Sequence, residues 1–571
     1  MSFVGAIDQG TTSTRFILFD HAGAIVSSGQ QEFQQYLPDE GRTEHDPEEI
    51  WNTVEYCVAQ ALSSTNPKNT LQRAIDVKEI ACVGITNQRE TSVVWDRATG
   101  KPYYRALVWM DMRSEDICGE LTRNHKEGQE RFRTKTGLPV SPYFSGTKIM
   151  WLLANVPELR DAAVRGDALF GTIDSWLLWK LSGGKVHATD VTNASRTLLM
   201  NINTLEWDED QCHTLGIPRA MLPEIRSSSE IYCHGAIGTC LEGVPISGIL
   251  GDQQAALFGQ AGMNPGAVKN TYGTGCFTLC NVGAQVVQSH HGLLSTVAFK
   301  LGPKQNNRVC YALEGSVPFA GACVEWLVKR LELIKKASES EQLSDAHDNG
   351  GVYFVPAFSG LYAPYWRDDA RGVIVGLTRY ANKGHLVRSA LEAVCFQTRE
   401  VCDAMRLDAE MSGVNLGNLS VLKVDGGMTV NERLMQMQAD ILHCEVQRPK
   451  IVETTALGAA YVAGLATGFF ASEAEVAKQW KLDRTFNPDE RAYSSERRSR
   501  EFGRWKRAIQ RTLHWMDDED PTDMLSNEQS QQDKREEHIV GVLGLLSLGL
   551  LAGISTGLAI GFSMWGTKKS R

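Results

Sequence analysis

Two strand–turn–strand segments of the same design, one in each half of the chain, constrain the fold more than any other feature. Residues 5–20 read GAIDQGTTSTRFILFD, and residues 266–281 read GAVKNTYGTGCFTLCN. Each combines an apolar strand, a turn rich in glycine and threonine, and a second apolar strand, which predicts a β-hairpin. One hairpin per half favours a duplicated α/β domain with a cleft between the copies. Chance similarity of two hairpins is the alternative at this point.

Four apolar runs end in polar side chains that could do chemistry. They end at Asp8, at Arg89 and Glu90, at Asp252 and Gln253, and at Asp425. The length and the β-branched content of these runs predict buried strands. Because ligands of α/β proteins gather at the carboxyl ends of strands, we expect the four ends to face one crevice.

Length and composition narrow the class of protein. A chain of 571 residues is too long for a single core and predicts several domains. The formal net charge of −10, without a long Lys/Arg stripe, argues against a nucleic-acid partner. The 13 cysteines form no CxxC pair, and we expect no signal peptide before Phe3. Both features indicate reduced thiols in the cytosol rather than a secreted disulfide framework.

The character of the chain changes after Trp515. Residues 516–538 are acidic and polar, which predicts a disordered linker. Residues 539–566 follow as an apolar stretch without a charged side chain, longer than the ~20 residues needed to cross a bilayer. A stretch so near the C-terminus predicts a transmembrane tail anchor, with a buried core helix as the alternative.

The predicted anchor suggests where the protein would lie. Its moderate hydrophobicity and short basic end are typical of anchors in the mitochondrial outer membrane, with the catalytic domains facing the cytosol. The endoplasmic reticulum membrane is the alternative. Glycines 549, 553, 557 and 561 would share one helix face, where two copies could associate as a homo-oligomer.

The first hairpin has the chemistry of a phosphate site. A turn of glycine and hydroxyl residues presents N–H groups and hydroxyls to phosphate oxygens. Asp8, at the mouth of this turn, would hold Mg²⁺ through its hydration shell. The chain has neither a Walker A pattern nor a protein-kinase glycine loop, which disfavours both of those classes.

Eight motifs together resemble one family. AIDQGTTSTR, GITNQRE, YFSGTK, GDQQAALFGQ, NTYGTGCF, FSGLYAPYW, VDGG and TALGAAYVAGL are similar to the FGGY carbohydrate kinases of the actin/hexokinase/Hsp70 ATPase superfamily. The resemblance runs from about Phe3 to Trp515. It implies two ribonuclease-H-like, actin-like ATPase domains over residues 1–255 and 256–515, the second binding the nucleotide. It also implies ATP-dependent phosphorylation of glycerol to glycerol 3-phosphate.

The resemblance carries substrate roles onto particular positions. Glycerol would be held by Arg89, Glu90, Trp109, Tyr143, Asp252, Gln253 and Phe277. The polar members of this set donate to and accept from hydroxyl groups, and the aromatic rings cover the C–H face of the substrate. Asp252 would be the general base that takes the hydroxyl proton during phosphoryl transfer. The alternative is that Asp252 only caps the helix that follows it.

Nucleotide roles carry over in the same way. ATP would contact Thr11, Thr12, Ser13, Arg15, Thr274, Gly321, Glu325, Gly427 and Asn431. A side chain at Gly427 would obstruct the approach of adenosine. Glu325 stands where bacterial relatives have glutamine, and a carboxylate cannot donate a hydrogen bond as an amide does.

Two other functions remain open at this point. One is a kinase for another polyol or sugar, because pocket volume cannot be read from the sequence. The other is a membrane-tethered ATP-binding scaffold, since actin-like and Hsp70-like proteins share the phosphate hairpins. The presence of Asp8, Asp252 and Asp425 together favours an enzyme.

Overall fold

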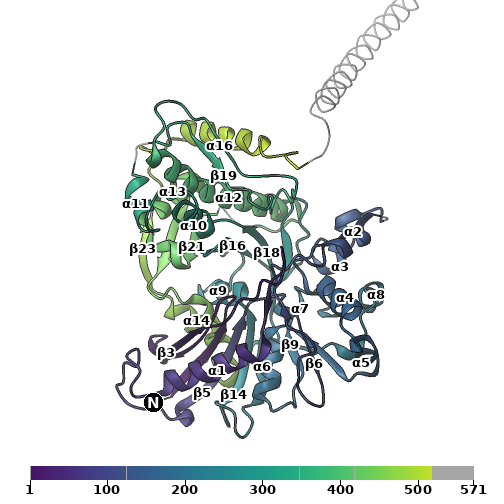
Figure 1. Ribbon diagram of the computed structural model, residues 1–571. Helices are drawn as coiled ribbons and strands as arrows, with labels where there is room; N and C mark the ends of the chain where they lie inside the picture. The colour runs from purple at the N-terminus through teal and green to yellow at the C-terminus, as the bar shows by residue number, and fades with distance from the viewer. Residues whose placement is uncertain (1, 124, 346–347, 417–418, 517–571) are drawn as a thin grey trace, which may run out of the picture. The chain divides into compact units, whose positions relative to one another are not determined.

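The computed structural model describes residues 2–123, 125–345, 348–416 and 419–516 (Figure 1). Residues up to Leu513 form one compact unit. Met516 is described, but the rest of the predicted linker and the whole predicted anchor at 539–566 lie outside the described residues. Within the described ranges, no helix combines the length and the apolar character needed to cross a membrane.

The first of the two large sheets has six strands. Their order is β13 (Ser229–His234), β14 (Pro245–Gly251), β5 (Ile80–Asn87), β1 (Phe3–Gln9), β2 (Ser13–Phe19) and β3 (Ile25–Glu32). The predicted hairpin is β1–β2, with Asp8 opposite Arg15. Strands β1, β5 and β14 are parallel neighbours, and Gln9, Asn87 and Gly251 lie in register at their carboxyl ends.

The second sheet repeats this design and adds one strand. Its order is β17 (Leu294–Lys300), β18 (Val309–Val317), β16 (Cys276–Gly283), β15 (Val268–Tyr272), β21 (Val421–Asp425), β22 (Glu445–Pro449) and β23 (Leu482–Phe486). In both sheets a central strand pairs antiparallel with its hairpin partner and parallel with a later strand. The duplication predicted from the two hairpins is therefore confirmed.

The central strands β1, β5 and β14 of the first sheet are buried on both faces, which explains why they are mostly apolar. Phe3 and Ile7 of β1 pack in a core with α1 (Pro47–Leu62) and α6 (Ile173–Leu181). The alternate residues Val4 and Ala6 face a second core. That core contains α9 (Asp252–Gly259) and α14 (Thr454–Thr467), together with residues of β16, β17 and β18.

Helices α9 and α14 lie between the two sheets, as Figure 1 shows. Their crossing is close because it is lined by small residues. A Cβ atom on Gly458 would lie 1.9 Å from the carbonyl oxygen of Ala255, and one on Gly259 would lie 2.0 Å from that of Thr454. Only glycine fits at either position. α14 follows the second sheet in sequence yet packs on β1, β5 and β14 of the first.

The outer face of the second sheet is covered by other helices. α12 (Lys383–Met411) and α13 (Glu432–Leu442) pack there in the largest apolar core, and α16 (Ser495–Gln510) packs on α12 through Trp505 and Phe396. α10 (Gly321–Lys329) follows β18, and α11 (Glu339–Leu343) packs against α12 and α13. Further helices of the first half are α2 (Glu115–Arg123), α3 (Arg133–Thr136), α4 (Ser145–Asn155), α5 (Leu159–Arg165), α7 (Val191–Ala194) and α8 (Glu209–Thr214), and α15 (Glu473–Gln479) follows α14.

Candidate active site

The carboxyl edge of the first sheet brings together three side chains that are far apart in the sequence. Asp8 lies near the end of β1, Arg89 follows β5, and Asp252 is the first residue of α9, directly after β14. The Arg89 Nε atom lies 3.1 Å from Asp252 Oδ1. Because β1, β5 and β14 are parallel neighbours, three of the four strand ends lie at one edge of the sheet, as expected. Asp425 ends β21 of the second sheet.

Asp252 does not occupy the capping position of its helix. The N-cap of α9 is Gly251, and the Asp252 carboxylate accepts hydrogen bonds from the N–H and side-chain amide of the adjacent Gln253, at 2.8 and 3.1 Å, besides its ion pair with Arg89. The side chain is about one third exposed. Because the side chain is partly exposed, its carboxylate can still be reached by a bound ligand.

A buried charge cluster lies beside Asp252 and consists of Arg89, Glu90, Arg196 and Glu314, each at most 2% exposed. Arg89 donates to both carboxylate oxygens of Glu314, at 2.6 and 2.7 Å. Arg196 Nε donates to Glu90 at 2.5 Å, and its Nη2 lies 3.3 Å from Glu314. Two positive and two negative charges balance, as a buried ionic group requires.

The pKa values of the two carboxyl groups in this cluster are shifted in opposite directions. Burial raises the pKa of Glu314, but Arg196 and Arg89 outweigh it and hold that pKa at about 2. Burial raises the pKa of Glu90 against the opposing effect of the same two arginines. Glu90 also has a backbone φ of 60°, a left-handed conformation that is uncommon for a non-glycine residue.

Sequence reasoning missed Arg196 and Glu314. The available signal was a lone charge within an otherwise apolar or small-residue segment: Glu314 lies in the middle of β18, VCYALEGSV, and Arg196 follows the short helix α7. Neither position reveals its partner, because Glu314 and Arg89 are 225 residues apart.

Three aromatic rings form a wall next to the cluster. The Trp109 ring lies 5.6 Å from Tyr143 and 6.4 Å from Phe277, both edge-on. The Trp109 indole N–H donates to the Thr11 hydroxyl at 3.0 Å, which ties the wall to the first hairpin. Burial raises the pKa of the Tyr143 hydroxyl, so it stays protonated. The resemblance had placed these three rings around the substrate, and the structure brings them together.

Two buried lysines support this wall and its surroundings. The Lys148 ammonium donates to the backbone carbonyls of Trp109 at 3.3 Å, of Tyr143 at 2.9 Å, and of Pro142. Lys269 donates to the Gln253 side-chain oxygen at 2.6 Å and to the Phe277 carbonyl at 3.2 Å. Burial lowers the pKa of each lysine to about 8.

Asp8 has the properties of a single carboxylate ligand. Among the described residues, its side chain makes no hydrogen bond or ion pair. Burial raises its pKa to about 7, although Arg15 lowers it. Within the same described residues no group of three or more His, Cys, Asp or Glu side chains could hold a metal by itself. This donor set fits Mg²⁺, which is usually bound by one or two carboxylates and completed by phosphate oxygens and water.

The two hairpin turns present exposed polar groups. Thr12 and Thr274 are exposed at the tips of the turns. The N–H groups of Ala320 and Ala322 donate to the Thr274 carbonyl at 2.9 and 3.0 Å, which joins the second turn to the start of α10. Gly321 must be small there, because a Cβ atom would lie 2.6 Å from the Gly273 carbonyl oxygen. Ser13 accepts a bond from Gln30 at 3.4 Å.

The remaining predicted nucleotide contacts differ in character. A Cβ atom on Gly427 would meet nothing within 4 Å, so this position faces open space. Arg15 pairs with Glu453 at 2.5 Å, just before α14. Asn431 caps α13 by accepting from Leu434 N–H at 2.9 Å, and its amide donates to Ser340 at 3.2 Å. Exposed Glu325 pairs with Lys329 one turn along α10.

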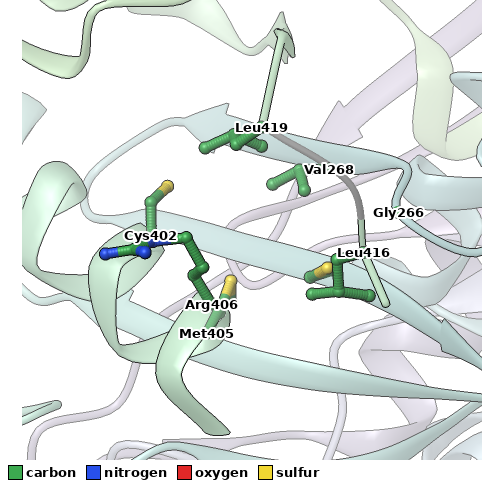
Figure 2. A pocket seen from close by; sticks show the side chains of 8 residues that line it. Gly266, Val268, Cys402, Met405, Arg406, Leu416 and Leu419 are labelled. Atoms are coloured by element: carbon green, nitrogen blue, oxygen red, sulfur yellow. The ribbon is translucent and has the colours of Figure 1, made fainter. Parts of the chain in front are cut away.

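The pocket drawn in Figure 2 is not part of this site. It is lined mainly by apolar side chains, including Val268, Cys280, Cys402, Met405 and Leu416. It lies between β15, β16 and α12, and none of the predicted site residues lines it. We therefore place the candidate site at the charge cluster and the hairpins.

Both halves of the chain are similar to known proteins. Residues 3–259 match the N-terminal domain model of the FGGY family of carbohydrate kinases, and residues 268–467 match the C-terminal domain model. A glycerol kinase of Brucella anthropi is 53% identical over 519 residues, which cover 90% of this chain and 99% of the relative. One of Leifsonia xyli subsp. xyli is 54% identical over 521 residues, with the same coverage.

Solved structures agree. Plasmodium falciparum glycerol kinase with ADP matches with a TM-score of 0.81 and 39% identity, covering 90% of this chain and 98% of that one. A ligand-bound xylulose kinase from Lactobacillus acidophilus has a TM-score of 0.77 at 20% identity and covers 89% of this chain and 97% of its own, which shows the shared fold alone.

The relatives also correct the predicted location. A place on the mitochondrial outer membrane, or on the endoplasmic reticulum, is contradicted, because these relatives at 53–54% identity come from bacteria, which have neither compartment. No described helix could cross a membrane, and the apolar stretch at 539–566 that suggested the location is outside the described residues. The location was inferred from that stretch alone and not from the rest of the chain, where the resemblance to these relatives lies.

Proposed function

This chain belongs to the FGGY family of carbohydrate kinases, and we propose that the candidate site phosphorylates glycerol with ATP, using Asp252 as general base. The product is sn-glycerol 3-phosphate. The observation that carries the assignment is the Arg89–Asp252 pair at the edge of the first sheet, closed in by Trp109, Tyr143 and Phe277. Curated relatives named glycerol kinase, at 53–54% identity, support the same substrate.

The polar groups suit a small triol. Arg89 can only donate hydrogen bonds, the carboxylates of Glu90 and Asp252 accept them, and Gln253 does both. Trp109 and Phe277 cover the C–H face of the substrate. A site that pairs each hydroxyl discriminates against analogues that lack one, because its own buried polar groups would then stay unpaired.

The transfer step follows from this placement. A glycerol hydroxyl oxygen forms a bond to the γ-phosphorus as the bond from that phosphorus to the β,γ-bridging oxygen breaks and ADP leaves. Asp252 takes the hydroxyl proton. Phosphoryl transfer needs mainly alignment and charge stabilisation, which suits a site with one carboxylate base and several fixed donors.

The predicted nucleotide-binding residues would act by donating hydrogen bonds and by leaving open space beside the backbone. The turns at Thr11–Ser13 and at Thr274 would hold phosphate oxygens, with Arg15 adding positive charge. Gly321 and Gly427 let the nucleotide approach the backbone, and Glu325 and Asn431 would lie beside it. Asp8 would hold Mg²⁺, which when bound neutralises charge on the phosphates.

An acceptor panel tests the proposal. The purified full-length chain is given ATP with glycerol, dihydroxyacetone, erythritol, xylulose or gluconate, and ADP formation is measured. We expect a strong preference for glycerol. Preference for another acceptor would make the chain a kinase for a different polyol or sugar. Tight ATP binding without turnover on any acceptor would indicate an ATP-binding scaffold.

A further inference from the structure

We propose that Glu314 is a positioning residue for glycerol binding and that it acts, together with Arg196, by fixing the side chains of Arg89 and Glu90. The inference rests on the proposed function and assigns a role to two residues outside the predicted substrate set. Glu314 lies on β18 of the second sheet, whereas Arg89 and Glu90 follow β5 of the first. The substrate-binding groups of one sheet are therefore held by a carboxylate of the other.

The contacts of Arg89 account for most of its hydrogen-bonding capacity. Nη1 donates to Glu314 at 2.6 Å and to Gln254 at 3.2 Å, Nη2 donates to Glu314 at 2.7 Å, and Nε faces Asp252. A guanidinium has five N–H groups in a fixed plane. With these contacts among the described residues, one Nη2 N–H is left for a ligand. The two-point contact with Glu314 sets the plane in which that group points.

Arg196 holds the carboxylate of Glu90, another residue of the predicted substrate set. Its Nε donates to Glu90 at 2.5 Å, and its guanidinium lies 5.5 Å from the Tyr143 ring centroid and 5.3 Å from that of Phe144. Nη2 is 3.3 Å from Glu314. Arg196 thus bridges Glu90 and Glu314, so loss of Glu314 would disturb both Arg89 and Glu90.

Glu314 is also close to the aromatic wall through the sheet. β18 pairs with β16, where Glu314 lies opposite Leu279 and Phe277 lies opposite Ser316. The strand that presents Phe277 to the substrate is therefore the neighbour of the strand that anchors Arg89. A shift of the second sheet relative to the first would change the wall and the hydrogen-bonding groups together.

The test is the variant E314Q, with E392Q as a matched control. Glu392 is a second buried glutamate held by an arginine, because Arg388 Nε donates to it at 2.6 Å and Asn349 at 2.9 Å. It lies on α12, and its partners Arg388 and Asn349 are not among the predicted site residues. Both substitutions keep the shape of the side chain and replace a buried, arginine-bonded carboxylate with an amide, although Glu314 contacts two arginines and Glu392 is bonded by Arg388.

We expect E314Q to raise KM for glycerol by about tenfold or more, to leave KM for ATP within about twofold, and to lower kcat by less than KM rises. E392Q should leave both KM values within about twofold. If E314Q does not fold, E314D keeps the charge but is too short to hold both Nη atoms, and it should show the same selective rise in KM for glycerol, by about threefold.

The outcomes separate this inference from the proposed function. Normal glycerol turnover by the wild type with an unchanged KM for glycerol in E314Q or E314D overturns the positioning role alone. Equal rises in both KM values, also seen in E392Q, overturn it as well, because they reveal a general loosening. A wild type that does not phosphorylate glycerol rejects the proposed function and this inference together.

Discussion

The proposed glycerol side and the proposed nucleotide side of the candidate site are built in opposite ways. On the glycerol side the polar groups are mostly buried and bonded to each other, as in the pair of Arg89 and Glu314. On the nucleotide side Thr12, Thr274, Glu325 and Gly427 are exposed. The first set selects its ligand with side chains already fixed in place. The second offers backbone groups, hydroxyls and empty space.

The difference matches the two ligands. A small triol has few atoms, so discrimination between acceptors must come from placing every hydrogen-bonding group correctly. A nucleotide is large, and its phosphates can be held by turns of glycine and threonine. We therefore expect the loss of a hydrogen-bonding side chain to have the larger effect on glycerol binding. For nucleotide binding we expect the larger effect from added bulk.

The largest expected effect is that of D252N. Asparagine has nearly the same shape but cannot take a proton, and loss of a general base lowers kcat by roughly 10²- to 10⁴-fold. ADP formation with saturating glycerol measures kcat, and direct ATP binding should change little. D46N is the matched control, because Asp46 caps α1 and asparagine is an equally good N-cap. More than a tenth of wild-type kcat in D252N would contradict the role of Asp252.

The second prediction concerns pH and Lys148. The pKa of Lys148 is about 8 in the folded chain and near 10.5 when unfolded. Between these pH values the unfolded chain binds the extra proton, so the free energy of unfolding rises with pH. The contribution of this lysine reaches at most about 3 kcal/mol, since one pKa unit is worth about 1.4 kcal/mol. K148M should lack this rise when denaturant unfolding is measured at pH 7 and pH 10.

K423M distinguishes stability from substrate binding. Burial lowers the pKa of Lys423 to about 8 as well, and its ammonium donates to the Gln260 carbonyl at 2.6 Å. Each methionine variant should therefore lose the part of the rise in unfolding free energy with pH that its lysine causes. Only K148M should raise KM for glycerol, because only Lys148 bonds the carbonyls of Trp109 and Tyr143. Equal KM values in the two variants would show that the wall does not depend on Lys148.

Much of the fold follows from local sequence patterns. The two glycine–threonine turns correctly predicted the duplicated sheet, and the polar ends of three apolar runs correctly predicted the edge where Asp8, Arg89 and Asp252 meet. Both signals lie within a few neighbouring residues. The place of α14 could not be predicted, because its residues are apolar all around and the pattern does not say which sheet it covers.

The charge cluster was missed for a related reason. Periodicity shows that Glu314 lies in a buried strand, but not that its partners follow β5 and α7. Such pairing depends on how two sheets meet across α9 and α14. The resemblance supplied Arg89 and Glu90 because they lie in a recognisable motif, whereas the residues that hold them lie outside it.

G427A tests the nucleotide side by adding one methyl group. A Cβ atom at this position meets nothing within 4 Å, so we expect an unchanged Tm. If adenosine approaches here, KM for ATP should rise by about tenfold, equivalent to about 1.4 kcal/mol, with KM for glycerol unchanged. G321A provides the contrast, since its Cβ would lie 2.6 Å from the Gly273 carbonyl oxygen and should lower Tm. An unchanged KM for ATP in G427A would remove Gly427 from the proposed nucleotide site.

The smallest expected effect is that of E325Q. The Glu325 carboxylate is more than half exposed and pairs with Lys329 on the same helix, an interaction worth only a few tenths of a kcal/mol. We therefore expect KM for ATP to change by less than about twofold. K329Q breaks the same pair but keeps the carboxylate. If E325Q lowers KM for ATP by fivefold or more while K329Q does not, the new amide has gained a hydrogen bond that a carboxylate cannot donate. In that case position 325 contacts the nucleotide. The exposed side of the site then binds its ligand through side-chain hydrogen bonds as well as through open space beside the backbone.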